Sequence, residues 1–348
     1  MSEAFEIRTL VRKNILEMKP YSSARDEYSG SASVFLDANE NPFNAPLNRY
    51  PDPRQLDLKT RIAQLKGISR DQIFLGNGSD EGIDVIFRVL CEPGRDNVIT
   101  VDPTYGMYGV CASINGVDRH SVLLNKDFSL DPDAVLTAVD EHTKLIFLCS
   151  PNNPTSNSLD REAILKIIDQ VNCMVVVDEA YIDFSQDAGL LSLLDGKKNL
   201  VVLQTLSKAW GFAGIRLGML FAHPELVEFL SRVKYPYNIN SLTLDAALKG
   251  LKNTEQSSKW IREILEERGS LVKQLESLPF IKKVHPSDAN FLLIQVEDPS
   301  AVYDFLMAKG IIIRDRSTVP LCEGCLRITI GTSEENRALI TALKTFQS

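Results

Sequence analysis

Lys208 occupies a position at which an amine could act as a nucleophile. It follows the apolar segment Leu200–Leu203, and Ser207 and Trp210 are its near neighbours. An amine that points into the protein there is poorly solvated; desolvation lowers its pKa, and a neutral amine attacks carbonyl carbons. The alternative is a solvated loop lysine, the usual state of this residue type. Arg216 lies eight residues further on and could meet a phosphate beside Ser207.

Asp178 ends the most apolar segment of the chain, Met174–Val177. A carboxylate at the end of a buried strand is costly without a cationic partner. A protonated pyridine nitrogen would be such a partner, and keeping that nitrogen protonated makes the ring an electron sink for carbanion chemistry. A helix cap or a salt bridge to an arginine would explain the residue equally well.

Four polar segments each follow an apolar segment, and together they predict a pocket at one rim of a sheet. Ligands of open parallel sheets bind outside the carboxyl ends of the strands. In such a pocket Asn153 and Tyr181 could hydrogen-bond a phenolic oxygen, and Tyr105 could stack on a ring. Taken singly, these three would be a turn residue and core aromatics. The four segments are Asp102–Tyr105, Ser150–Pro154, Asp178–Tyr181 and Thr205–Lys208.

The glycine-rich segment Gly76–Gly82 joins a predicted strand to a predicted helix. Glycines let the backbone approach a phosphate, and a helix N-terminus attracts it. Ser79 could instead be a plain N-cap. The spacing is GxGxxxG, whereas a dinucleotide site has GxGxxG, although Asp102 lies about 20 residues downstream as that fingerprint requires. A nicotinamide-dependent oxidoreductase is therefore an alternative, but it would leave Lys208 and Asp178 without a role.

Apolar segments alternate with helical patterns between about residue 71 and residue 240. The segments are apolar at every position, which indicates strands buried on both faces of a mostly parallel sheet. After Asn240 an amphipathic helix is expected from about Leu242 to Leu278, with a break near Asn253, followed by short strands and helices. The expected strands are 73–75, 98–101, 145–149, 174–177, 200–203 and 218–222, and then 290–296 and 326–330.

These patterns predict an α/β protein of three parts. We expect residues 1–45 to form an arm that packs with the small domain, residues 46–245 a large domain, and residues 246–348 a small α+β domain. The net charge of −8 argues against non-specific nucleic-acid binding. No apolar run approaches the roughly 20 residues of a membrane helix, and the first residues lack a signal-peptide pattern, so we expect a cytoplasmic protein.

Six cysteines are present, and in a cytoplasmic protein they are expected to be reduced thiols. Cys322 and Cys325 form a CxxC, but no second pair stands at zinc-site spacing. A turn before a strand is therefore favoured over a metal site. The sequence also lacks the GxSxG and HExxH motifs of other catalytic classes.

Nine stretches between about Tyr21 and Ile330 form a recognisable set: LDANENPF, RYPDP, LGNGSDEGID, DPTYGMY, SPNNPT, VDEAYIDF, TLSKAWGFAGIRLG, GIIIRDR and LRITIGT. Through them the chain resembles the fold-type I pyridoxal-phosphate aminotransferases, and among them the histidinol-phosphate aminotransferases. The resemblance implies a large domain with a mostly parallel sheet between helices, plus a smaller α+β domain. One departure is Ser156, where the family's NPTG has glycine.

The resemblance implies that the cofactor is pyridoxal 5′-phosphate, bound to Lys208 as an imine. Lys208 would also move the proton between the substrate α-carbon and C4′ of the cofactor. Asp178 would pair with the pyridine nitrogen, Asn153 and Tyr181 would contact the phenolic oxygen, and Tyr105 would stack on the ring. The residues implied at the cofactor phosphate are Gly78, Ser79, Asp80, Thr205, Ser207 and Arg216, with Tyr50 from the second subunit of a homodimer.

The same resemblance implies a ping-pong transamination between glutamate and imidazole-acetol phosphate, which yields 2-oxoglutarate and L-histidinol phosphate. Arg327 would anchor the anionic group of both substrates, and Arg314, Tyr21 and Asn41 would assist. Two alternatives on the same framework are a threonine-phosphate decarboxylase and an aromatic amino acid aminotransferase. A non-enzymatic cofactor-binding sensor would need a nucleic-acid-binding domain, for which no residues remain.

Overall fold

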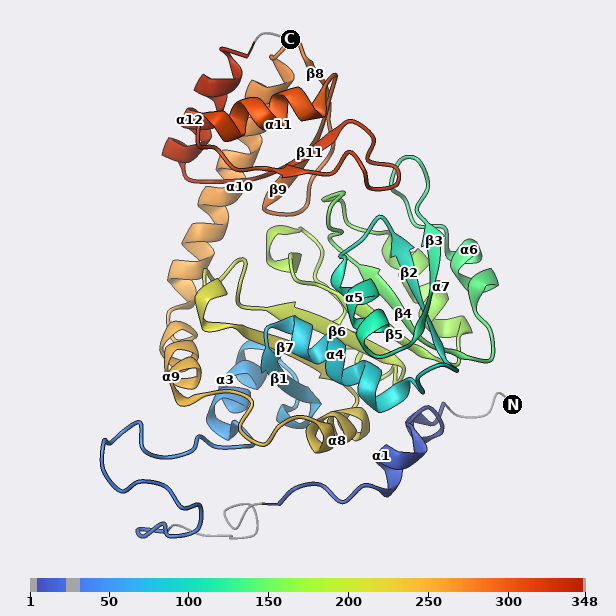
Figure 1. Ribbon diagram of the computed structural model, residues 1–348, viewed down its shortest axis with the longest axis vertical. Helices are drawn as coiled ribbons and strands as arrows, with labels where there is room; N and C mark the ends of the chain where they lie inside the picture. The colour runs from blue at the N-terminus through green and yellow to red at the C-terminus, as the bar shows by residue number, and fades with distance from the viewer. Residues whose placement is uncertain (1–4, 23–31, 347–348) are drawn as a thin grey trace.

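The computed structural model describes residues 5–22 and 32–346, and its large domain is built on one seven-stranded sheet (Figure 1). The strands are β1 (Ile73–Asn77), β2 (Asn97–Asp102), β3 (Asp118–Leu123), β4 (Thr143–Cys149), β5 (Met174–Asp178), β6 (Leu200–Thr205) and β7 (Leu217–Ala222). They lie in the order β1-β7-β6-β5-β4-β2-β3. The pairs from β6 to β3 are parallel, whereas β7 runs antiparallel to both β1 and β6. The predicted mostly parallel sheet is confirmed.

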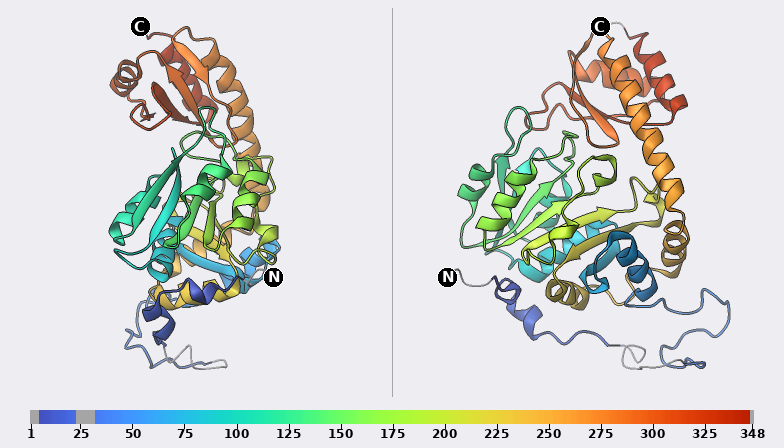
Figure 2. Two further views of the ribbon diagram at one scale, coloured as in Figure 1. Left: turned by 90° about the vertical axis from the view of Figure 1, so that its right-hand side faces the viewer. Right: turned by 180° about the vertical axis from the view of Figure 1, so that it is seen from behind.

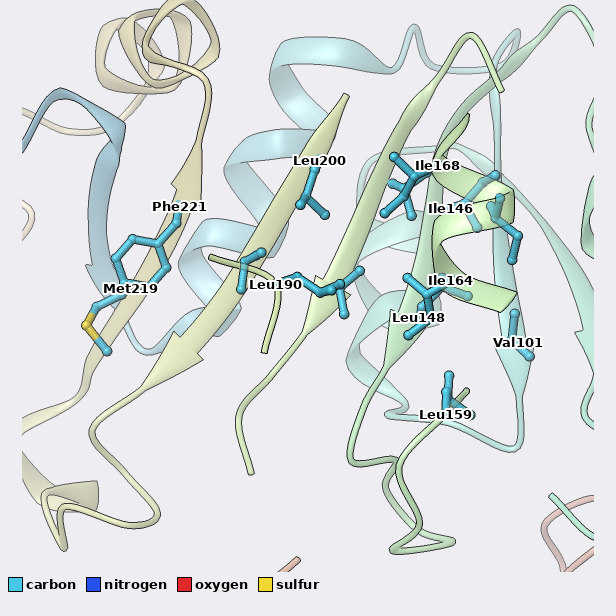
Figure 3. Packing of buried hydrophobic residues seen from close by; sticks show 14 of the residues in the cluster. Val101, Ile146, Leu148, Leu159, Ile164, Ile168, Leu190, Leu200, Met219 and Phe221 are labelled. Carbon is cyan, nitrogen blue, oxygen red and sulfur yellow. The ribbon is translucent and has the colours of Figure 1, made fainter. Parts of the chain in front are cut away.

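Helices cover both faces of this sheet. One face packs on α3 (Leu56–Lys66), α6 (Pro132–Ala138), α7 (Arg161–Gln170) and α9 (Ser241–Gly250), and Figure 3 shows part of this core. The other face packs on α4 (Ser79–Leu90), α5 (Met107–Ile114) and α8 (Pro224–Val233). Successive residues of β5 enter opposite cores, which explains why its sequence is apolar at every position. Short 3-10 turns are η1 (Ile7–Thr9), η2 (Arg70–Gln72), η3 (Ile182–Phe184), η4 (Leu191–Leu193) and η5 (Ala213–Ile215).

The small domain is an antiparallel sheet with helices on one face. Its strands are β8 (Ile281–Val284), β9 (Phe291–Val296), β10 (Arg314–Asp315) and β11 (Cys325–Thr329), in the order β10-β11-β9-β8. The helices α10 (Thr254–Glu276), α11 (Pro299–Ala308) and α12 (Ser333–Leu343) share its core. Strand alternation sends Leu326 and Ile328 into that core. Cys325 and Arg327 therefore face the large domain.

The two domains are connected through α9 and the long helix α10 (Figure 2). Asn253 caps α10 by accepting a hydrogen bond from Gln256, which confirms the predicted break at that residue. Ala247 and Leu251 lie in the core of the large domain. The expected division at residue 245 remains a prediction, and the packing of α9 favours a boundary nearer Asn253.

The arm contacts the large domain. Ile7, Val11 and Ile15, the last of them on α1 (Lys13–Glu17), enter the core beneath α4 and α8. Arg12 donates its backbone N–H to Val89 and forms a salt bridge with Glu92. In Figures 1 and 2 this segment lies at the end of the molecule opposite the small domain. Within one chain, these residues therefore do not make the predicted contact with the small domain.

All six cysteines are buried free thiols. The CxxC forms a turn, since the Cys325 N–H donates to the Cys322 carbonyl, and this turn leads into β11. Across residues 5–22 and 32–346, no helix combines the length and the apolar character required to cross a membrane.

Candidate active site

A cavity of about 680 Å³ lies between the two domains, at the carboxyl ends of β2, β4, β5 and β6. The polar segments that follow these strands line it, as expected for a parallel sheet. The small domain closes it with residues of β10 and β11. The predicted site residues that line this cavity are Gly78, Ser79, Asp80, Tyr105, Asn153, Asp178, Tyr181, Thr205, Ser207, Lys208, Arg216, Arg314 and Arg327.

Lys208 lies in the loop directly after β6. Its Nζ is 5.6 Å from the centroid of the Tyr181 ring. Part of the side chain is open to the cavity, but desolvation, and next the nearby positive charge of Arg327, lower the pKa of its amine. A lysine with a lowered pKa carries a larger neutral fraction and is a better nucleophile for a carbonyl carbon. The position therefore supports covalent attachment of an aldehyde.

Asp178 ends β5 and is buried. Its two oxygens accept hydrogen bonds of 3.0 Å from the Ala180 N–H and 2.7 Å from the Tyr108 hydroxyl. Burial raises the pKa of its carboxyl to about 6. Within the described part of the chain, no lysine or arginine forms a salt bridge with Asp178. A carboxylate held this way is suited to a cationic ring nitrogen placed in the cavity.

Tyr108 is a site residue that sequence analysis missed. It belongs to α5, is fully buried, and its ring stacks on Phe147 with 4.6 Å between centroids. It lies three residues after Tyr105 in the stretch DPTYGMY, and the two rings meet edge to face with 5.7 Å between centroids. The available signal was this closeness in sequence to the polar segment Asp102–Tyr105 at the end of a strand.

The N-terminus of α4 provides a place for an anion. Gly78 is the N-cap residue of α4, and no side chain forms a capping hydrogen bond there. Ser79 is the first helical residue, so the alternative that Ser79 is the N-cap is wrong. Gly78 has a φ of +75°, and a Cβ there would lie 2.6 Å from Nη2 of Arg216. The free N–H groups, the helix dipole and the Arg216 guanidinium together favour a phosphate.

Thr205 and Ser207 complete this corner of the cavity. The Thr205 hydroxyl lies 3.0 Å from that of Ser207 and also accepts the Ser207 N–H. Across the cavity Tyr105 donates a 3.1 Å hydrogen bond to Asp80, whose other oxygen forms a 3.7 Å salt bridge with Arg216. Asp102, the residue that a dinucleotide site would use, forms a salt bridge with Arg119 instead and does not line the cavity.

Three arginines come from the small domain. Arg314 of β10 lies opposite Arg327 of β11, and Arg327 donates a short hydrogen bond to the Asn153 side chain. Arg316, which sequence analysis missed, also lines the cavity, and none of the described residues accepts a hydrogen bond from its buried Nε. Its signal was the RDR spacing of GIIIRDR, which places a second arginine two residues after Arg314, directly beyond the end of β10. The cluster is suited to carboxylate or phosphate groups.

Three predicted residues lie outside this cavity in their own chain. Tyr50 is half exposed and stacks on Tyr237 at 4.5 Å. Asn41 accepts a hydrogen bond from the Phe43 N–H. Tyr21 is exposed and lines another hollow, under the arm. One subunit alone thus does not bring them to Lys208.

Comparisons with known proteins show the family of this chain. The family of class I and II aminotransferases matches residues 31–343. The histidinol-phosphate aminotransferase of Parabacteroides distasonis is 57% identical over 339 residues, which cover 97% of this chain and 98% of that protein. The crystal structure of the histidinol-phosphate aminotransferase from Clostridium acetobutylicum has a TM-score of 0.79 at 25% identity, over 86% of this chain and 90% of the other. That from Sinorhizobium meliloti, in complex with pyridoxal-5′-phosphate, has a TM-score of 0.79 at 24% identity, over 99% and 98%.

Proposed function

The chain belongs to the class I and II aminotransferases, and to the histidinol-phosphate aminotransferases within them. We propose that it transfers the amino group of glutamate to imidazole-acetol phosphate. The products are 2-oxoglutarate and L-histidinol phosphate, an intermediate of histidine biosynthesis. The observation that carries the proposal is the cluster of Arg314, Arg316 and Arg327 facing the same cavity as Lys208. Both amino donor and acceptor are anions, and guanidinium groups bind carboxylate and phosphate alike.

The cavity fits pyridoxal phosphate as cofactor. Lys208 offers an amine of lowered pKa to the aldehyde, and Asp178 is a buried carboxylate that forms no salt bridge with any described residue. The uncapped N-terminus of α4 and Arg216 would hold the phosphate. Asn153 and Tyr181 would hydrogen-bond the phenolic oxygen, and Tyr105 would lie against the ring. The donors and acceptors of the cavity thus correspond, group by group, to those of the cofactor.

When bound, the cofactor supplies an electron sink for the electron pair left on the substrate α-carbon. The ionised carboxylate of Asp178 would hold the protonated ring nitrogen, and Tyr108 keeps Asp178 in place. Lys208 would move the proton between the substrate α-carbon and C4′ of the cofactor. Arg327 would hold the anionic group of either substrate and so fix the α-carbon beside Lys208.

The substrate assignment has a direct test. The purified holoprotein would be incubated with glutamate and imidazole-acetol phosphate, and 2-oxoglutarate, histidinol phosphate and carbon dioxide would be measured. Stoichiometric 2-oxoglutarate and histidinol phosphate are expected. Release of carbon dioxide from threonine phosphate would identify a decarboxylase, and turnover of phenylpyruvate in place of the phosphate would identify an aromatic aminotransferase.

A homodimer is part of the proposal, with Tyr50 reaching the cofactor phosphate of the partner. The arm and the residues after it expose large apolar side chains in a single chain, which a second copy would cover. Leu36 is 91% exposed, Phe43 78% and Val34 70%. We also place the enzyme in the cytoplasm, where six free thiols stay reduced.

Mixing two inactive variants tests the dimer. In a Lys208→Ala/Tyr50→Phe heterodimer, one site combines the intact lysine of one subunit with the intact tyrosine of the other. Random exchange of subunits should restore about a quarter of wild-type activity if the dimer is symmetric. If sedimentation shows that the subunits have exchanged and no activity is recovered, Tyr50 serves the site of its own subunit.

A further inference from the structure

Ser156 adopts a backbone conformation that usually requires glycine. Its φ is +67°, in the left-handed region, and the residue is fully buried. The turn is closed by the Ser156 N–H, which donates to the Asn152 carbonyl at 2.8 Å. The turn of residues 152–156 thus keeps the shape that the family's glycine would allow, and the serine side chain is an addition to it.

The added hydroxyl reaches the small domain. Ser156 Oγ is shared between the carbonyl of Thr155 at 2.6 Å and that of Pro286 at 3.1 Å. Pro286 belongs to the loop of residues 286–288, between β8 and β9. The Asp288 N–H donates to the Ser156 carbonyl at 2.8 Å, and the Asp288 carboxylate accepts the Ser158 N–H at 2.9 Å. These hydrogen bonds join the two domains at one point.

The same turn makes a second contact with the small domain at its other end. Asn153 accepts the short hydrogen bond from Arg327. The 286–288 loop leads into β9, and Leu293 of β9 pairs with Arg327 of β11. The turn therefore touches the substrate-binding strand directly and also through the strand beside it.

We propose that Ser156 is a positioning residue, whose hydroxyl fixes the small domain, and with it Arg327, at the distance from Lys208 that the substrates require. This rests on the proposed transamination. Substrate binding draws Arg327 away from Asn153 toward the substrate anion. The hydrogen bond from Ser156 to Pro286 then holds the two domains in the same relative position while the contact between Arg327 and Asn153 is broken. A glycine at 156 would leave this contact with the 286–288 loop to the two hydrogen bonds of Asp288, one from its N–H and one to its carboxylate.

The chain offers a variant that separates this role from folding. Ser156→Gly removes the hydroxyl and also relieves the left-handed strain, so the two effects on stability oppose each other and the melting temperature should change little. Apparent Kd for glutamate and for histidinol phosphate, taken from the saturation of each half-reaction of the holoenzyme, should both rise roughly three- to tenfold, the worth of one hydrogen bond. The limiting rates should stay near wild type.

Two further variants make the test decisive. Ser156→Ala retains the strain, so it should show the same rise in Kd with a lower melting temperature. Ser158→Ala is the matched control, because the Ser158 hydroxyl meets Ser185 within the large domain, and its Kd values should be unchanged. The positioning role is wrong if Ser156→Gly keeps the wild-type Kd values, or if Kd rises equally in Ser158→Ala. If the wild-type enzyme converts glutamate but not histidinol phosphate, the substrate assignment is wrong. The Kd values for glutamate would still decide whether Ser156 is a positioning residue.

Discussion

The hydroxyl of Tyr108, on α5, donates a 2.7 Å hydrogen bond to the carboxylate of Asp178, at the end of β5. Both residues are buried, and the tyrosine ring is fixed by stacking on Phe147. The carboxylate that would face the cofactor nitrogen is therefore oriented from behind by a neighbouring helix. Orientation of this kind lets a buried acid keep its ionised form, because the hydrogen bond stabilises the negative charge.

Tyr108→Phe should raise the pKa of Asp178 further, since it removes a donor and keeps the ring. A hydrogen bond to a charged group is worth about 1.5–3 kcal/mol, so a shift of about one to two pH units is expected. Activity requires ionised Asp178, so the acidic limb of the kcat/KM profile should move to higher pH. Cofactor affinity should fall as well. An unchanged acidic limb would show that Tyr108 does not hold the catalytic form of Asp178.

Asp178→Asn should stabilise the cofactor-free protein while it inactivates the enzyme. Burial raises the pKa of Asp178 to about 6 from 3.8, so between these values the folded protein holds a proton that the unfolded chain has lost. Stability contributed by this group therefore falls as the pH rises through that range, by up to about 3 kcal/mol. At pH 8 the cofactor-free variant should melt above the wild type.

The same comparison at lower pH provides the control. Near pH 4 both forms carry an uncharged side chain at position 178, and their melting temperatures should converge. With the cofactor bound, the order at pH 8 should reverse, because only the carboxylate pairs with the ring nitrogen. A wild type as stable as the variant at pH 8 without cofactor would mean that Asp178 is not strained by its burial.

The cavity could be located from the sequence because the polar residues that line it lie at the ends of apolar strands. Segments such as Met174–Val177 are apolar throughout, so the polar residue that follows each of them is conspicuous. The edge strand β3 (Asp118–Leu123) lacks that signal. It is largely exposed and was not predicted, although it pairs with β2 along its whole length.

Other features depend on contacts that local sequence does not specify. Ile7, Val11 and Ile15 repeat at helical spacing and predict an apolar face, but nothing in the pattern selects the surface under α4 and α8 that receives it. Tyr108 was not predicted as a site residue, because its partner Asp178 is seventy residues away in the sequence. Tyr50 points to no site within one chain, so sequence patterns alone could not place it.

Gly218→Ala should damage the phosphate corner of the cavity. A Cβ on Gly218 would lie 2.1 Å from the Ser79 nitrogen, and backbone cannot yield as a flexible side chain would. Overpacking of this kind costs about 1–3 kcal/mol, and here it displaces the N-terminus of α4. Both the melting temperature and the affinity for pyridoxal phosphate should fall. Gly214→Ala is the matched control, since a Cβ there meets nothing within 4 Å.

Arg327→Lys should impair both half-reactions to a similar extent. The lysine keeps the positive charge but loses the planar pair of donors that can bind a carboxylate or a phosphate through two hydrogen bonds. Values of kcat/KM for glutamate and for histidinol phosphate should each fall roughly ten- to a hundredfold, as expected for a charge-assisted hydrogen bond. The absorption spectrum of the bound cofactor should stay normal, because Lys208 and Asp178 are untouched. Loss of one half-reaction alone would show that the two anions use different arginines, with Arg314 or Arg316 as the second anchor.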